Sequence, residues 1–71
     1  MMVIKPGDRV IARSATNQWL HRRAVTGVIK GMDFPVVRVC EEEEWSKART
    51  QGREPESFAW PAEEVKVDAE A

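Results

Sequence analysis

The residue types that most often carry out chemistry are scarce in this sequence. Its only histidine is His21 and its only cysteine is Cys40. A metal site, or a thiol activated by an imidazole, would use both residues and a third partner, and the spacing of the chain indicates no such partner. A cysteine at the end of an apolar run is typical of a small core or edge residue. We therefore predict no metal site, no disulfide within the chain and no catalytic residue.

A run of four glutamates, residues 41–44, is the other group suited to acid–base chemistry. Two carboxylates act as general acid and general base only when their surroundings push their pKa values apart. Glutamates at the start of an exposed helix share one environment, so we interpret them as helix-start and solubility residues. A chain of 71 residues also has little volume for a substrate pocket of about 300 Å³. We expect a protein that is not an enzyme and that uses no cofactor.

The charged residues divide the chain into two halves of opposite sign. Residues 1–40 hold seven Lys or Arg and two Asp, a net charge of +5, and residues 41–71 hold four Lys or Arg and ten Asp or Glu, a net charge of −6. Cations that neutralise phosphates, beside a ring that stacks on bases, are typical of single-stranded nucleic-acid binding. One hypothesis is therefore a basic face beside Trp19, made by Arg13, His21, Arg22, Arg23 and Arg38. The alternative is that the acidic helix folds back over this face and cancels its charge, or that both are solvated surface.

Three tryptophans lie in three different settings. Trp60 stands in a run with strand character, which predicts a core or core-edge residue. Trp45 is the one large apolar residue of an acidic segment and is expected to anchor it. Trp19 lies in a polar stretch beside Leu20, which favours an exposed interface residue, although the ring could instead cap an open end of the fold. The predicted protein-binding residues are Trp19, Leu20 and Trp45.

The composition predicts one small folded domain over residues 1–71. An apolar share of 42% with a net charge of −1 argues against disorder, which needs few apolar residues and a large uncompensated charge. No apolar run approaches the roughly 18 residues of a membrane span, and the first residues lack the apolar stretch of a signal peptide. A single cysteine fits a reducing compartment. We expect a cytoplasmic protein without a membrane partner.

The first forty residues have the pattern of three strands. A turn signal at residues 6–8 precedes the first of them, and apolar positions change face near Gly27, which predicts a β-bulge. The segment 26–40 reads as two apolar runs joined by a turn, the central hairpin of an antiparallel sheet. We predict strands at 8–13, 23–32 and 36–40, a long loop at 14–22 and a turn at 31–35.

The charge order of the next segment predicts a helix over residues 42–51. Its acidic residues come first and Lys47 and Arg49 come last, as the helix dipole favours, while Gly52 and Pro55 can end the helix. The remaining residues return to strand composition, and a proline suits the first position of a helical turn. We predict a strand at 56–60, a single helical turn at 61–64, a last strand at 65–67 and a frayed tail at 68–71.

Four short motifs carry a resemblance to a known fold family. They are Gly-Asp-Arg-Val at 7–10, Thr-Gly-Val-Ile at 26–29, Val-Val-Arg-Val at 36–39 and Trp-Pro-Ala-Glu-Glu-Val at 60–65. Together with the order of elements they resemble SH3-like barrels of the Tudor and KOW type, including short proteins of actinobacteria and phages. The resemblance implies a mainly β fold, a small antiparallel barrel of about five strands, with a helical insertion at about 41–55 between strands three and four.

Two functional hypotheses follow. The first is a non-enzymatic interaction module that binds a protein partner through the long first loop or through the helical insertion. The second is a small RNA- or DNA-binding accessory protein that uses the basic face of strands one to three. SH3 domains that bind proline-rich peptides resemble one another through a row of tyrosines, and this chain has no tyrosine, so we do not expect that ligand.

Overall fold

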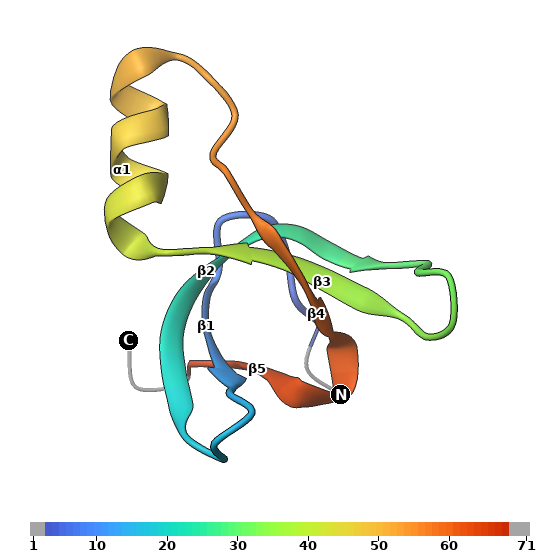
Figure 1. The fold of residues 1–71 in the computed structure, drawn as a ribbon. Helices are drawn as coiled ribbons and strands as arrows, with labels where there is room; N and C mark the ends of the chain where they lie inside the picture. The colour runs from blue at the N-terminus through green and yellow to red at the C-terminus, as the bar shows by residue number, and fades with distance from the viewer. Residues whose placement is uncertain (1–2, 69–71) are drawn as a thin grey trace.

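The computed structural model describes residues 3–68, so residues 69–71 of the predicted tail at 68–71 lie outside the described residues, while the Asp68 N–H donates a 2.9 Å hydrogen bond to the Arg9 carbonyl. Five strands, one α-helix and one 3₁₀ turn make up the fold (Figure 1). The prediction of a mainly β chain with about five strands and one helix is confirmed. In chain order the elements are β1 (Arg9–Arg13), β2 (Trp19–Ile29), β3 (Val36–Cys40), α1 (Glu42–Gln51), β4 (Phe58–Pro61), the 3₁₀ turn η1 (Ala62–Glu64) and β5 (Val65–Val67).

All five strands form one antiparallel sheet in the order β4-β3-β2-β1-β5. Strands β1, β2 and β3 each pair with the next strand of the chain, whereas β5 does not pair with β4 and returns to pair with β1. Because neighbours in sequence are neighbours in the sheet, most of the fold is built from short connections. The sheet curls into a compact molecule with extents of 31 × 28 × 26 Å.

The predicted long loop at 14–22 is wrong, because strand structure resumes at Trp19. A tight turn over residues 14–18 replaces the loop, held by hydrogen bonds from the Ser14 and Asn17 backbone N–H groups to the Gln18 and Ser14 carbonyls. Asn17 takes a left-handed conformation with φ of 65°, which asparagine tolerates better than most residues. The residues after this turn pair with β1, so strand pairing overrides a polar sequence that has no apolar alternation.

The predicted bulge at Gly27 is confirmed. The pairing of β2 with β3 shifts register between Ala24 and Val28. A Cβ atom on Gly27 would lie 2.8 Å from the carbonyl oxygen of Ile4, closer than real Cβ contacts come. The glycine therefore lets the N-terminal segment approach the backbone of β2 at the point where the strand bends.

One apolar cluster fills the inside of the curled sheet. Trp60 of β4 packs against this cluster, as predicted for a core-edge residue, and its indole Nε1–H donates a 2.9 Å hydrogen bond to the Arg13 carbonyl. This bond ties β4 to the end of β1, which is not its neighbour in the sheet. The buried members of the cluster are Ile4, Val10, Ala12, Ala24, Val37, Val39 and Val65.

The predicted helix is confirmed as α1, with the predicted bounds. Gly52 ends it in a left-handed conformation with φ of 66°, and the Arg53 N–H then donates to the Ala48 carbonyl. Ala48 is fully buried and Trp45, the predicted anchor, is half-buried, so α1 packs against the sheet through these two residues. Figure 1 shows α1 standing off one edge of the sheet, with residues 52–57 returning beside it.

Candidate functional site

The five predicted nucleic-acid-binding residues do not share one face. In the β1–β2 ladder Arg22 lies opposite the buried Val10, so it projects from the core side of the sheet. Arg13, His21 and Arg23 project from the outer side, because alternate residues of a strand point to opposite faces. The fifth residue, Arg38 of β3, is half-buried.

The cations of the outer side are paired with acids from the second half of the chain. Arg13 forms an ion pair with Glu64 that raises the pKa of the guanidinium and lowers the pKa of the carboxyl. Arg23 Nε donates to Glu42 at 3.0 Å. His21 Nδ1 lies 3.2 Å from an Asp68 carboxylate oxygen. Acidic residues therefore pair with part of the basic face, but the predicted acidic helix contributes only Glu42 to these pairs, and Glu64 and Asp68 lie beyond it.

Trp19 lies in β2 and not in a loop. Its ring is 41% exposed, and Arg13 lies directly opposite it in β1. The Arg13 guanidinium and the Lys66 ammonium lie 5.8 and 5.0 Å from the ring centroid, within cation–π range. Leu20 lies opposite the buried Ala12, on the other side of the sheet. Trp19 and Leu20 therefore do not form one binding surface.

Trp45 packs at the base of α1. The Arg23 guanidinium lies 5.7 Å from the centroid of its ring and also donates a 2.8 Å hydrogen bond to the Gly7 carbonyl. A Cβ atom on Gly7, whose φ is 92°, would lie 3.6 Å from the ring. Arg23 thus joins β2, α1 through Trp45 and Glu42, and the turn before β1. The third predicted protein-binding residue serves to attach α1 to the sheet.

A hollow of about 440 Å³ lies between α1 and the segment that returns to the sheet. Arg38, one of its lining residues, donates 2.8 and 2.9 Å hydrogen bonds to the hydroxyl and the carbonyl of Ser57. Arg53 donates at 2.6 Å to Glu44, which also accepts from the Glu56 N–H at 2.8 Å. These two bonds, with the Arg53 bond the larger cause, lower the pKa of Glu44 to about 2. The guanidinium group of Arg38 therefore ties Ser57 to β3, and that of Arg53 ties the segment after α1 back to the helix.

A different surface, at the end of the β2–β3 hairpin, exposes large apolar side chains. Met32 is fully exposed, and Val28 and Phe34 are 55% and 51% exposed. Two hollows of about 450 and 460 Å³ open on this surface and share Val28, Phe34 and Pro35 as lining residues. We call it the hairpin surface, made by Val28, Ile29, Met32, Phe34, Pro35, Pro61 and Ala62.

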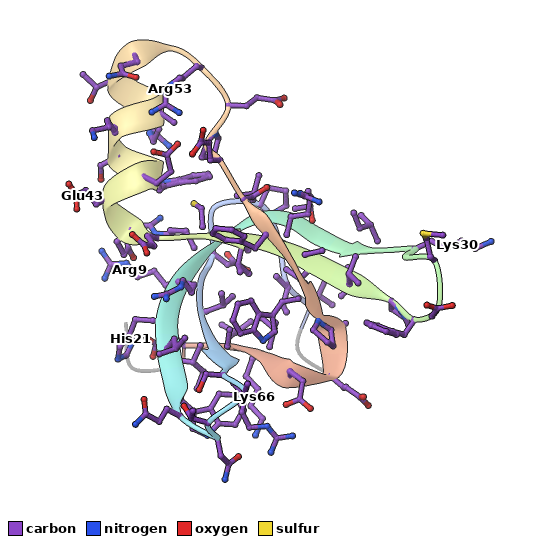
Figure 2. The ribbon with its side chains drawn as sticks, viewed as in Figure 1. Arg9, His21, Lys30, Glu43, Arg53 and Lys66 are labelled. Atoms are coloured by element: carbon purple, nitrogen blue, oxygen red, sulfur yellow. The ribbon has the colours of Figure 1, made fainter. Side chains whose placement is uncertain are left out.

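The hairpin surface is held in shape by a tight turn and one long-range bond. A Cβ atom on Gly31 would lie 2.3 Å from the Phe34 carbonyl oxygen, so only glycine lets the chain close there. The Ala62 N–H donates a 3.0 Å hydrogen bond to the Pro35 carbonyl, which fixes η1 against the turn. Beyond the bulge the hairpin runs past the core, and Figure 2 shows Lys30 at its far end, away from α1.

Sequence reasoning missed the hairpin surface, although a signal was present. The turn was predicted at 31–35, and it contains Met32 and Phe34. Turn residues are usually polar, because a turn lies on the surface and its side chains have no core to reach. Two large apolar residues in a turn of five therefore indicate an exposed apolar patch or a covered one, and this turn is exposed.

Two further chemical candidates are the thiol of Cys40 and clusters of possible metal ligands in the described part of the chain. Cys40 is fully buried, and burial is the main cause that raises the pKa of its thiol, followed by the Glu44 and Glu42 carboxylates. Among residues 3–68 no group of three or more His, Cys, Asp or Glu side chains is arranged to hold a metal ion. Over the same residues no helix has the length and hydrophobicity to cross a membrane.

Comparison with models of known protein families, with curated proteins and with solved structures finds no match. Any functional assignment therefore rests on the surfaces of this chain itself.

Proposed function

We propose that the protein is a non-enzymatic interaction module that binds protein through the hairpin surface. The observation that carries this proposal is the exposure of Val28, Met32 and Phe34 around two hollows that share lining residues. Contiguous exposed apolar patches rimmed by polar residues mark interaction sites, and Met and Phe are enriched at the centres of protein interfaces. The chemistry that fits is another polypeptide that places apolar side chains in these hollows.

We also propose that the fold is an SH3-like barrel. Three features support this assignment: the strand order with β5 beside β1, the long β2 bent at Gly27, and the 3₁₀ turn between β4 and β5. In this interpretation α1 and residues 52–57 replace the short link between strands three and four. A cytoplasmic location is part of the same proposal, and the buried free thiol of Cys40 supports it.

We favour protein binding over nucleic-acid binding because cations of the predicted basic face already have partners within the chain. Arg13, Arg23 and His21 have acidic partners within the chain, and Arg38 is bonded to Ser57. A phosphate backbone would have to compete with these partners. The apolar side chains of the hairpin surface have no such partner, so their burial is gained only on binding.

Site-specific photocrosslinking tests the proposal. A benzophenone amino acid replaces Met32 in one variant and Gln51, an exposed residue at the end of α1, in a matched control. We expect a crosslinked protein adduct at Met32 in the native host and none at Gln51, and we expect Phe34→Ser to abolish the adduct. No adduct at Met32, or one that Phe34→Ser leaves unchanged, would overturn the proposal.

A further inference from the structure

We propose that the polypeptide bound at the hairpin surface is a second copy of this chain, in a two-fold symmetric dimer. The inference rests on the proposed function, that the hairpin surface binds protein, and names the partner. A two-fold interface brings the same patch of both copies together, so the patch must be complementary to itself in shape and in charge.

The charges at the hairpin turn meet this requirement. Lys30 and Asp33 have opposite signs, and both are exposed. Neither side chain forms an ion pair or hydrogen bond with the rest of residues 3–68, so both charges are open to a partner. Antiparallel packing of two hairpins directs Lys30 of one copy toward Asp33 of the other, and this pairing occurs twice. A rim of one sign would have repelled its own copy.

The apolar part of the patch is also suited to its own copy. Met32 and Phe34 lie on either side of Asp33 in the turn, next to hollows lined by Val28 and Pro35. A flexible Met side chain adapts to an irregular hollow, so Met32 of one copy can enter the hollow of the other while its own receives the same residue. The hollows and the residues that fill them therefore belong to one surface.

The size of the surface predicts a weak dimer. A half-exposed large apolar side chain offers about 100 Å² for burial, so four of them offer about 400 Å² per copy. With the charged rim, the total surface area buried on the two copies is about 1,000 Å², at the low end of specific interfaces. We therefore expect monomer and dimer to exchange, with a dissociation constant on the order of 10 to 100 μM.

Sedimentation velocity over a range of concentrations tests the inference with the full chain. We expect the mass to be 8.1 kDa in dilute solution and to rise toward twice that value at high concentration. Phe34→Ser should weaken the dimer by about 30-fold or more, because it removes a central apolar side chain. Lys30→Asp and Asp33→Lys should each weaken it by about tenfold, since each variant sets like charges against each other at both pairs.

The double variant, Lys30→Asp with Asp33→Lys, separates charge pairing from a simple loss of solubility or fold. It restores both pairs with their signs exchanged, so we expect dimerisation close to that of the wild type. Lys47→Asp, an exposed change on α1, is the matched control and should have no effect. Circular dichroism of every variant checks that the fold is kept.

The outcomes distinguish this inference from the proposed function. A chain that is monomeric at every concentration, or a dimer that the double variant fails to restore, would overturn the second-copy inference. If the benzophenone at position 32 then still labels a different protein, the proposed function stands. If it labels nothing, both fail.

Discussion

The two ends of the sheet differ in whether their side chains have partners within the same chain. At the end formed by β5, β1 and the first half of β2, charged groups from distant parts of the sequence are paired, Arg13 with Glu64 and His21 with Asp68. At the other end, beyond the bulge at Gly27, the β2–β3 hairpin exposes Met32 and Phe34 and leaves their hollows open. At the first end charged side chains are paired within the chain, and at the second end large apolar side chains remain exposed.

This difference shows that the number of cations or aromatic rings in a segment is a poor guide to a binding surface. Trp19 and its neighbouring arginines have the composition of a nucleic-acid site, yet Arg13 and Lys66 lie over the ring and Glu64 pairs with Arg13. The hairpin turn has one cation and one anion and no tryptophan, yet its apolar side chains extend past the core. Changes at the first end should therefore alter stability, and changes at the second should alter association.

The largest expected effect comes from Trp60, which joins the two ends. Trp60→Ala removes a ring packed on the core and the hydrogen bond to the Arg13 carbonyl, so we expect a loss of about 3 to 4 kcal/mol of unfolding free energy. Trp60→Phe, which keeps most of the ring, should lose only about 1 kcal/mol. Urea denaturation followed by circular dichroism measures both. Equal losses in the two variants would contradict the role of packing.

Arg23→Ala tests the paired end directly. It removes the hydrogen bonds to Gly7 and Glu42 and the contact with Trp45, and we expect a loss of about 2 kcal/mol. Arg22→Ala is the matched control, because among residues 3–68 the Arg22 side chain bonds only to the carbonyl of His21, and the variant should lose less than half as much. The same denaturation experiment applies, and a larger effect for Arg22 would show that the pairing of Arg23 is not what holds α1.

The pKa of Glu44 predicts a pH dependence for the helical insertion. Its folded value of about 2 lies below the ordinary value of 4.5, so the ionised carboxylate contributes stability above pH 4.5. This contribution is lost as the pH falls from about 4.5 to about 2. We expect the unfolding free energy of Glu44→Gln to fall less steeply than that of the wild type over this window. If the unfolding free energies of the two proteins fell equally steeply, the result would contradict the role of the bonds that Glu44 accepts from Arg53 and Glu56.

The smallest effect on stability is expected at the hairpin surface. Met32 is fully exposed, so Met32→Ser should change the unfolding free energy by less than about 0.5 kcal/mol, measured in dilute solution where the chain is monomeric. The same variant should weaken self-association in sedimentation. A large loss of stability would mean that Met32 packs within its own chain.

Local signals in the sequence predicted most of the elements. The charge order and Gly52 located α1, and the change of face at Gly27 located the bulge. The loop at 14–22 was mistaken because a polar stretch such as His21–Arg22 becomes a strand only through its partner β1. The ion pair of Arg13 with Glu64 joins residues 51 positions apart, which no local pattern encodes.

The hairpin surface could have been predicted only in part. Apolar residues in the turn at 31–35 were visible in the sequence, but their exposure depends on how far the hairpin runs past the core. The bulge, Gly31 and the bond from Ala62 to Pro35 shape the hairpin, and the last of these joins it to a residue distant in the sequence.

A dilution series of amide NMR spectra is the most direct test of the hairpin surface. It asks whether this surface binds protein and whether the bound protein is a second copy of the chain. We predict that the amide shifts that move with concentration belong to residues 28–34 and to Ala62, and that those of the outer side around Trp19 stay fixed. Shifts that move around Trp19 and His21, with the hairpin unchanged, would contradict the assignment of the two ends.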